Sequence, residues 1–432
     1  MSDIDIPQVQ TPRVSPEVRV PVRAWIVLAM LVAAYSFSWV DRSLLIILID
    51  PLSKELHVTN TQIGLLTGFG SSLLYSLAGF PIARLADKGS RRAIITAAVG
   101  AWSLLTAASG FAGSFLTLAL SRCGIAISSA GCSPAAYSLI SDYFPQKRRG
   151  TAIAIYSLGI SIGMWAGLTF GGILEDKFGW RYAFMMLGFP GVLLATLFFL
   201  IVKEPQRGLY DQHVEGSDRQ YSLKEAAAHI FSHPSFLLIA IGFALVGAAN
   251  STFENWIPTY MIRVNHMSSS EVGSISGLFQ GVTGFVGTLL FGLLADKLGN
   301  RDKRWYIWLA VLGFVFSGAG AVIFFKLTGV AMYVCYFVVE FSQSAIYAPI
   351  FTASQALLPP RLRALGMATV LFLLNVIGMG AGPSLAGWFS DCFAERGFSD
   401  GLAPAIALMQ VSGLVGIIFL LGASRSLHNR KS

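Results

Sequence analysis

Charged residues are scarce in this sequence. They make up 12% of the 432 residues, whereas hydrophobic residues make up 54%, and a soluble domain usually carries about 25% charged residues. A soluble fold of this length could not keep that much apolar surface from water. The composition therefore excludes an ordinary soluble protein and indicates a membrane protein.

Residues for metal, redox or hydrolytic chemistry are also few. The four cysteines have no CxxC spacing, and the six histidines are scattered, so neither a disulfide framework nor a zinc site is indicated. The sequence also lacks a nucleophile–base arrangement and a nucleotide-binding P-loop. We therefore expect no enzyme activity, no metal and no other cofactor, with a proton gradient as the candidate energy source. The net charge of +8 would suggest nucleic acid in a soluble protein, but here the basic residues stand between apolar runs, so no nucleic-acid partner is expected.

Long apolar runs dominate the chain instead. A helix that crosses the bilayer core needs about 20 mostly apolar residues. Twelve such runs lie at residues 24–49, 61–83, 93–113, 115–141, 150–174, 181–202, 235–258, 270–294, 305–325, 330–357, 366–390 and 402–423. The predicted fold class is an all-α membrane protein with twelve transmembrane helices.

The distribution of basic residues predicts the orientation. If the N-terminus is cytoplasmic, 23 of the 31 Lys and Arg residues fall in cytoplasmic segments, six on the opposite side, and two inside spans. Cytoplasmic loops are enriched in Lys and Arg. We therefore expect a multi-pass protein of the cell membrane with both termini in the cytoplasm.

The polar segments predict the boundaries of the domains. Residues 1–23 lack the apolar region of a cleaved signal peptide and are expected to form a disordered cytoplasmic tail. The predicted bundles are 24–202 and 234–424, followed by a tail at 425–432. Between them, residues 203–233 form a linker, in which Ser222 and Glu225 have the spacing of a capping box that would begin a short surface helix.

The two halves share landmarks, which predicts two pseudo-symmetric six-helix bundles with a binding site between them. Asp87 and Asp296 follow the second and eighth spans, 209 positions apart, and Gly167 and Gly382 are 215 positions apart. The matching segments are 83–92 with 292–301, 145–150 with 359–366, and Asp41-Arg42 with Glu254-Asn255.

These motifs resemble the major facilitator superfamily over residues 24–424. The loop pattern G-x-L-A-D-R-x-G-R-R of that family is matched well in the second half, while Ala83 replaces the first glycine in the first half. Within the superfamily, the stretches 40–42, 133–145 and 255–260 resemble the Spinster-like branch, whose members are associated with the export of sphingolipids and lysolipids. The resemblance implies alternating access, in which the two halves rock about a central site.

The loop motifs are candidates for a gate. Asp87, Arg91, Arg148 and Asp296 lie at cytoplasmic helix ends, where charge-assisted bonds between carboxylate and guanidinium can hold neighbouring helices together. In the family such a latch holds the outward-facing state. The alternative interpretation is a solvated charge cluster that only sets topology.

Three charges inside spans are the main site candidates. Asp or Arg near the bilayer centre costs about 2.5–3.5 kcal/mol, so Asp41, Arg42 and Arg122 must face a wet cavity or one another. Adjacent residues on a helix point about 100° apart, which makes Arg122 the expected partner of Asp41. One interpretation is a purely structural ion pair. The other is that Arg42 and Arg122 bind a phosphate or carboxylate head group, with Asp41 as the proton-sensitive switch.

Further polar residues complete the predicted site. Ser129 stands where the resembling family usually has a glutamate, which leaves Arg122 one partner short and makes a two-carboxylate proton relay doubtful. Glu340 and Tyr347 share a face of the tenth span, and we include both, with Ser129, among the substrate-binding candidates. Glu254 in the seventh span fits a structural role better.

The sequence leaves several functions open. A secondary transporter of an amphipathic anion of the lipid, lysolipid or sphingolipid type fits arginines beside apolar walls. A transporter or exchanger of a small organic anion or sugar phosphate is the alternative, and a non-transporting membrane receptor or enzyme is more remote. We expect membrane lipids and a small amphipathic or anionic substrate as partners, and a monomer.

Overall fold

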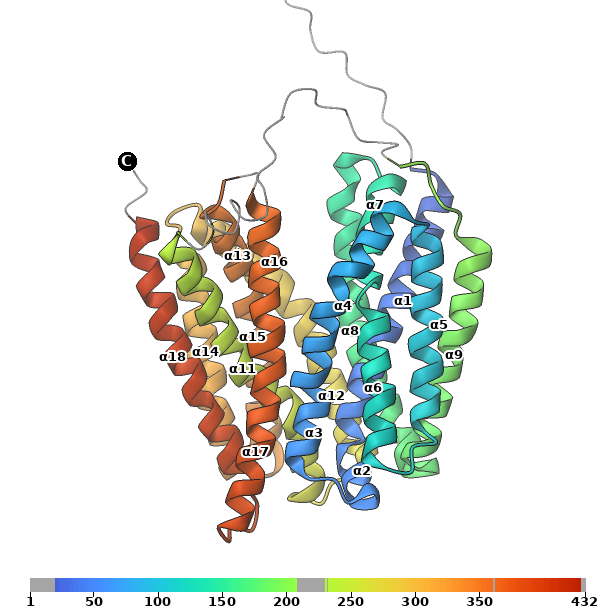
Figure 1. Ribbon diagram of the computed structural model, residues 1–432. Helices are drawn as coiled ribbons and strands as arrows, with labels where there is room; N and C mark the ends of the chain where they lie inside the picture. Colours follow the sequence, from blue (N-terminus) through green and yellow to red (C-terminus); the bar gives the residue numbers. More distant parts are fainter. Residues whose placement is uncertain (1–19, 208–229, 231, 360–361, 429–432) are drawn as a thin grey trace, which may run out of the picture.

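The computed structural model describes residues 20–207, 230, 232–359 and 362–428 (Figure 1). Regular structure in these residues is helical throughout, and twelve helices are long and apolar enough to cross a membrane. The predicted all-α membrane fold is confirmed. Helices suit these apolar runs because lipid offers no hydrogen-bond partner to the backbone, so each span must satisfy its own N–H and C=O groups.

The helices form two groups of six spans. The first group, here called the N-half, contains α1 (Val22–Ile47), α2 (Ile49–Leu56), α3 (Asn60–Thr67), α4 (Phe69–Lys88), α5 (Arg91–Ser109), α6 (Phe115–Ser129), α7 (Cys132–Tyr143), α8 (Gln146–Phe178) and α9 (Trp180–Ile201). The second group, the C-half, contains α11 (Pro234–Arg263), α12 (Ser269–Val282), η1 (Thr283–Gly287), α13 (Thr288–Gly299), α14 (Trp305–Ile323), η2 (Phe324–Lys326), α15 (Gly329–Ala356), α16 (Arg363–Leu373), η4 (Leu374–Ala381), α17 (Gly382–Glu395) and α18 (Leu402–His428).

The structure moves two predicted boundaries. Helix α1 begins at Val22, inside the segment expected to be a tail, and α18 continues to His428, beyond the predicted end of the bundle at residue 424. Both extensions consist of residues that can continue a helix at the membrane surface. The predicted surface helix beginning near Ser222 lies outside the described residues.

Several spans are interrupted, and polar side chains satisfy the freed backbone groups. The second span breaks at Gly68 between α3 and α4, where the hydroxyl of Ser384 accepts from the N–H of Phe69 (3.0 Å) and donates to the carbonyl of Gly64 (2.8 Å). The eighth and eleventh spans contain the π-helical turns η1 and η4, to which Ser344 and Ser251 donate hydrogen bonds (2.9 and 2.7 Å). Such turns often mark functional positions in a helix.

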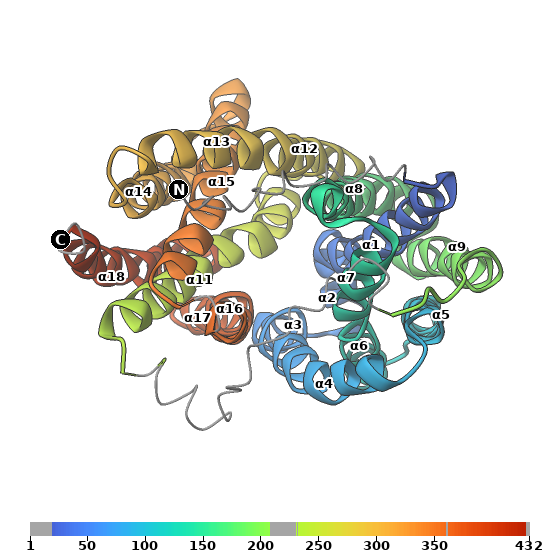
Figure 2. The ribbon, with the colours of Figure 1, turned by 90° about the horizontal axis from the view of Figure 1, so that it is seen from above.

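The two halves stand side by side, close together at one end and apart at the other (Figures 1 and 2). We call the end where α1 begins and α18 finishes the terminal end, drawn at the top of Figure 1. The hydrogen bonds that described residues make between the halves lie toward the opposite end; they join α3 and α4 to α17, α8 to α12, and α2 and α3 to Arg263 of α11. The molecule is thus sealed at the opposite end.

Two carboxylates close this sealed end in the same way. The Asp176 carboxylate at the end of α8 accepts hydrogen bonds from the backbone N–H groups of Ser269 and Ser270 at the start of α12 (3.2 and 2.7 Å). The Asp391 carboxylate at the end of α17 accepts from Asn60 and Thr61 at the start of α3 (3.1 and 2.7 Å). In each case an anion from one half meets the positive end of a helix dipole in the other half.

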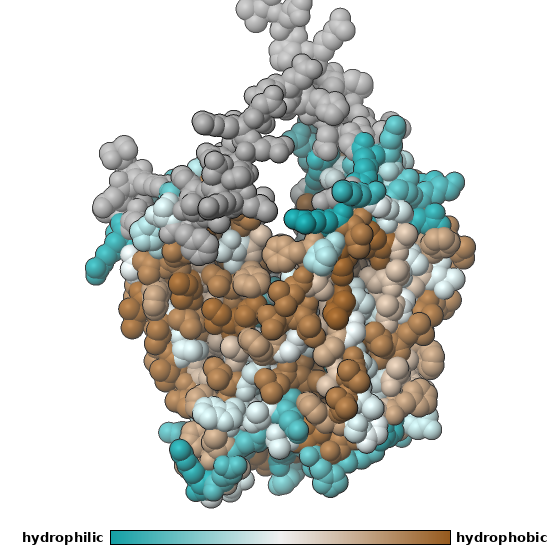
Figure 3. All heavy atoms as spheres, in the orientation of Figure 1, coloured by the Kyte–Doolittle hydropathy of each residue, from teal (hydrophilic) through white to brown (hydrophobic). Residues whose placement is uncertain are grey.

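The outer surface matches a bilayer. Large apolar side chains are exposed on many spans, among them Leu200 (68%), Leu293 (71%) and Ile418 (69%). Figure 3 shows these apolar residues as a broad band with hydrophilic residues at both ends, and a notch between the halves at the terminal end. The band is the surface expected to contact lipid.

Candidate functional site

The notch at the terminal end is bordered by helix α4. A cavity of about 880 Å³ opens there, lined by Phe80, Pro81, Arg84, Leu85 and Lys88. Two cationic side chains thus stand among apolar ones in a single wall. This combination suits a molecule that carries both an anionic group and an apolar part.

Arg42 lies deeper along the same route. Its side chain is exposed, although it belongs to the middle of a span, and its guanidinium lies 5.0 Å from the centroid of the Trp39 ring. Its charge also acts on the hydroxyls of Tyr35 and Tyr75. Arg84 lies nine residues beyond Tyr75 on α4, a rise of about 13 Å toward the terminal end. Positive charge is therefore spaced along the route from the cavity to Arg42.

Tyr35, which lies near Arg42, belongs to a cluster of aromatic side chains. The rings of Tyr35 and Tyr156 are stacked with centroids 4.5 Å apart, and Tyr137 meets Tyr156 edge to face at 5.4 Å. These rings come from α1, α7 and α8. Helices α1 and α8 can approach closely because a Cβ on Gly163 would come within 2.4 Å of the Ser36 carbonyl oxygen, which is the packing role expected of such glycines.

Asp41 points away from Arg42, into the interior of the N-half. Its carboxylate forms an ion pair with Arg122 of α6 at 3.1 Å and accepts a hydrogen bond from the Thr106 hydroxyl of α5 at 2.5 Å. Both ionised residues are buried, with 6% of Asp41 and 4% of Arg122 exposed. The 100° between neighbouring helical positions separates the two charges as expected, and Asp41 and Arg122 do pair.

Arg122 does not reach the opening in this conformation. Its guanidinium packs over the Phe184 ring at 4.7 Å, and its Nε and Nη2 atoms are buried without a hydrogen-bond partner in the described chain. Ser129, seven positions later, donates to the carbonyl of Ala126 (3.2 Å). In this state Asp41 holds Arg122 in the interior of the N-half, and the binding of a head group by Arg122 stays a prediction. Because Ser129 stands in place of a glutamate, Arg122 was expected to lack one partner. The two Arg122 nitrogen atoms without a described partner agree with that expectation.

The C-half contributes a polar cluster between α11, α12 and α15. Glu340 and Tyr347 occupy one face of α15, as predicted; Glu340 is 5% exposed, and the Tyr347 ring packs edge to face on Phe243 at 5.6 Å. Glu254 of α11 is half-buried and follows Phe253, whose ring packs on Tyr336 of α15. The structural role expected for Glu254 stays a prediction.

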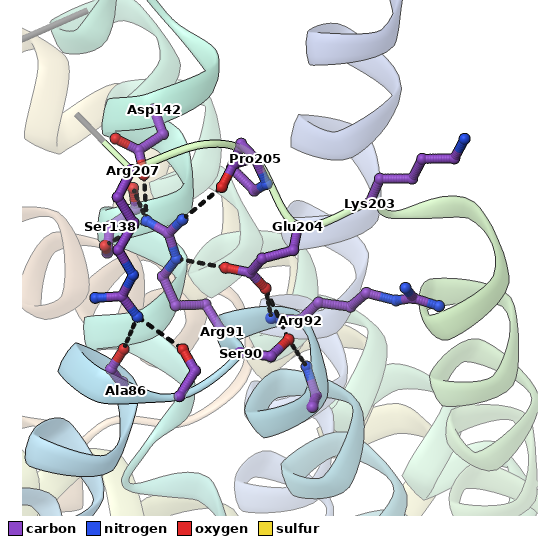
Figure 4. A network of polar contacts seen from close by, with 12 residues as sticks. Ala86, Ser90, Arg91, Arg92, Ser138, Asp142, Lys203, Glu204, Pro205 and Arg207 are labelled. Atoms are coloured by element: carbon purple, nitrogen blue, oxygen red, sulfur yellow. Dashed lines mark hydrogen bonds and ion pairs between the residues drawn. The ribbon is translucent and has the colours of Figure 1, made fainter. Parts of the chain in front are cut away.

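The predicted gate residue Arg91 is the centre of a network at the terminal end (Figure 4). Its guanidinium forms ion pairs with Asp142 of α7 and with Glu204 after α9 (2.8 Å to Glu204), and it donates to the Ser138 hydroxyl at 2.9 Å. Burial raises the pKa of Glu204, but hydrogen bonds from the Arg92 backbone and from the Arg91 and Ser90 side chains outweigh it, so this pKa lies below its ordinary value. The network lies within the N-half.

Two other predicted gate residues, Arg148 and Asp296, do not join it. Arg148 and Asp296 are exposed at helix ends and make no ion pair with another described residue, and the side chain of Asp87 lies outside the described part. Arg207 instead caps the end of α4, donating to the carbonyls of Ala86 and Gly89 (2.8 and 2.7 Å).

Sequence reasoning missed Thr106 and the sealing carboxylates. A threonine inside an apolar span carries no signal of its own. The two carboxylates did carry a signal, which is the offset of the internal repeat. Asp176 and Asp391 are 391 − 176 = 215 positions apart, as are Gly167 and Gly382. Their partners Asn60 and Ser269 are 269 − 60 = 209 positions apart, as are Asp87 and Asp296.

Comparisons with known proteins agree with this geometry. The family model for the Major Facilitator Superfamily matches residues 31–383. The chain is 32% identical to an MFS-type efflux pump of Mycolicibacterium smegmatis, covering 93% of this chain and 92% of that protein. It is 25% identical to the sphingosine-1-phosphate transporter SPNS2 of Danio rerio, covering 87% and 78%.

A solved structure has the same fold. It is the crystal structure of a bacterial homolog to the human lysosomal transporter Spinster in an inward-facing and unoccupied conformation. The TM-score is 0.86 at 28% sequence identity, covering 94% of this chain and 98% of that one.

Proposed function

This chain belongs to the Major Facilitator Superfamily, with the Spinster-like character that its motifs indicated, and we propose that it is a secondary transporter of an amphipathic anion of the lipid, lysolipid or sphingolipid class. It works by alternating access in the cell membrane. The terminal end is the cytoplasmic end, which agrees with the bias of basic residues toward that side.

The observation that carries this proposal is the placement of Arg42. A guanidinium exposed at mid-span costs several kcal/mol unless it borders water or binds an anion. Arg42 stands beside Trp39, Tyr35 and Tyr75, so one position offers a charged donor and an apolar wall. A guanidinium binds phosphate or carboxylate in a bidentate manner and remains charged at all relevant pH values.

The cavity beside α4 supports an amphipathic substrate. Arg84 and Lys88 attract an anionic head group, while Phe80 and Leu85 contact a chain. The head group then moves inward to Arg42. A small polar anion would gain nothing from the apolar part of this wall.

The conformation supports alternating access. The halves are sealed at the opposite end by Asp176, Asp391 and Arg263 and separate at the terminal end. The similarity to an inward-facing structure fits this assignment. Export then begins with uptake from the cytoplasmic side, in line with the relative described as an efflux pump.

Flux measurement in proteoliposomes tests the proposal. We expect transport of a fluorescent lysophospholipid with an anionic head group, inhibited by unlabelled anionic lysolipids and not by a soluble dicarboxylate or sugar phosphate at the same concentration. Equal competition by the soluble anions would favour the alternative, a transporter of small organic anions. No lysolipid flux, with uptake of the soluble anion, would contradict the proposed substrate class.

Coupling to protons through Asp41 is a separate prediction. Asp41 is held by Arg122 and Thr106 in this conformation, so a role in coupling requires these contacts to change during the transport cycle. Flux by Asp41→Asn across an imposed pH gradient is the test, and unchanged pH dependence would exclude Asp41 as the coupling residue.

A further inference from the structure

The polar cluster of the C-half contains two carboxylates that form no ion pair with a described basic residue. On α15, Tyr336, Glu340, Gln343 and Tyr347 follow one another at spacings of four, three and four, so they share one face of the helix. Glu340, Gln343 and Tyr336 are buried, with 5%, 3% and 0% of each residue exposed. This face is directed at α11 and α12, not at lipid.

The packing of rings places Glu254 opposite this face. Helices α11 and α15 run antiparallel, with Phe253 against Tyr336 (centroids 5.9 Å apart) near one end and Phe243 against Tyr347 (5.6 Å) near the other. Glu340 lies between these two levels on α15, and Glu254 follows Phe253 on α11. Glu254 and Glu340 are thereby placed on facing helices at neighbouring levels.

Several buried atoms around the two carboxylates lack partners. They are Oε1 of Glu340, Oε1 of Gln280, Oε1 of Gln343 and Nδ2 of Asn250, each on a residue at most 5% exposed. Gln280 donates its Nε2 to the Tyr336 hydroxyl at 3.5 Å. Buried polar groups in a native protein are nearly always hydrogen-bonded, so this concentration of open oxygens points to something that binds there.

The surrounding groups offer no positive charge. The titratable groups that face Glu340 are Tyr336 and Tyr347 on its own helix and Glu254 from α11, whereas α12 presents only the neutral Ser276 and Gln280. Among the described residues, no Lys, Arg or His forms an ion pair with either carboxylate. Two like charges at bilayer depth without a counter-ion repel each other and are poorly solvated.

We propose that Glu254 and Glu340 form a proton-carrying pair that shares one proton in the inward-open state. Glu254 is half-buried and forms the entrance. A hydronium ion from the water at the terminal end gives up its proton there and becomes water, and a new O–H bond forms on a carboxylate oxygen of Glu340 behind it. The charge of the pair then changes from −2 to −1. A second proton would make the pair neutral, and its loss to the other side would complete a cycle of transport.

This site complements the N-half. Ser129 occupies the position of a second carboxylate there, and Asp41 is committed to Arg122. Glu254 and Glu340 of the C-half form no such ion pair with a described residue. The proposal goes beyond the transport of a lipid anion and is tested without any substrate.

Infrared titration of the purified full-length protein in nanodiscs tests the pair. The carbonyl stretch of a protonated carboxyl group is separate from the carboxylate bands, so the band can be followed with pH for the wild type, Glu340→Gln, Glu254→Gln and the exposed control Glu395→Gln. We expect a protonated carboxyl band in the wild type at neutral pH that Glu395→Gln retains and Glu340→Gln removes. Glutamine mimics the protonated acid in size and charge, so folding should be preserved.

Glu254→Gln provides the second readout. Loss of the like charge should move the titration midpoint of the remaining carboxyl to lower pH by at least one unit, a tenfold decrease in proton affinity. Identical titrations of all four proteins would overturn the proposal. A midpoint that depends on Na⁺ at constant ionic strength, with choline as the replacement, would also overturn it by showing a sodium site.

Discussion

A single buried carboxylate, Asp41, holds together three helices of the N-half. It pairs with Arg122 of α6 and accepts from Thr106 of α5. Removal of one member of a buried pair leaves the other charge unpaired and costs about 3–5 kcal/mol. We expect Asp41→Asn to lower the unfolding temperature strongly.

The double variant separates this role from a role in transport. In Asp41→Asn/Arg122→Gln both charges are absent, so most of the lost stability should return. A fluorescence-based thermal unfolding assay of both single variants and the double variant measures the coupling. Additive losses of stability would show that the pair does not stabilise the fold.

At the scale of residues, the sequence predicts that Asp41 pairs with Arg122, but it does not predict in which direction the side chains of Asp41 and Arg42 point. The spacing of Asp41 and Arg42 separates their charges and favours pairing across helices, which the structure bears out. It cannot tell which of the two faces the opening, since that depends on how α1 rotates against α8. This rotation follows from the close contacts of Gly159, Gly163 and Gly167 with α1, which no local pattern specifies.

At the scale of elements, contacts at the first residues of helices α3 and α12 keep the sealed end closed. Each is capped by a carboxylate from the other half, Asp391 or Asp176. Caps and helix-dipole contacts of this kind contribute about 0.5–2 kcal/mol each. Asp176→Ala/Asp391→Ala should shift the molecule about 10-fold or more toward states open at this end.

Distances between spin labels on the sealed ends of α3 and α17 measure this shift. Asp400→Ala is the matched control, because Asp400 caps Leu402 and Ala403 of its own half. We expect longer distances in the double variant and unchanged distances in the control. Equal distributions in all three proteins would rule out a sealing role for the two carboxylates.

The Arg91 network fixes the start of α5 to the segment after α9, and its strength should depend on pH. The pKa of Glu204 in the fold lies below its ordinary value of 4.5, so the contact stabilises the protein above about pH 4.5 and is lost as pH falls through the lower value. Such a partly exposed ion pair contributes about 0.5–1 kcal/mol.

Thermal unfolding of Glu204→Gln from pH 3.5 to 7 checks this. We expect the variant to be less stable than the wild type near neutral pH and the difference to shrink as pH falls below the ordinary pKa of 4.5, with Glu395→Gln behaving as the wild type throughout. A difference that grows as pH falls would contradict the assignment.

The internal repeat of the sequence predicts more about the helices and their contacts than its motifs alone suggest. The twelve predicted spans agree with the observed helices to within a few residues, since hydropathy reports directly on contact with lipid. The offsets of 209 and 215 also relate the two sealing contacts. The π-helical turns η1 and η4 were not predictable, because they depend on hydroxyls donated by Ser344 of α15 and Ser251 of α11.

For the whole molecule, two halves enclose a route that is open at the terminal end and sealed at the other. The cavity wall at the open end carries Arg84 and Lys88, and Arg42 is exposed at mid-span beside Trp39. The twelve-helix architecture follows from the sequence. The state of the molecule does not, because opening depends on contacts between halves that are far apart along the chain.

Head-group selectivity of Arg42→Gln tests the central claim most directly. Hydrogen bonds to charged groups contribute about 1.5–3 kcal/mol, so proteoliposomes with the wild type should prefer an anionic lysolipid over a zwitterionic one of equal chain length by about tenfold or more. Arg42→Gln should lose this preference, while Arg396→Gln at the sealed end should keep it. Selectivity of Arg42→Gln equal to that of the wild type would contradict the account.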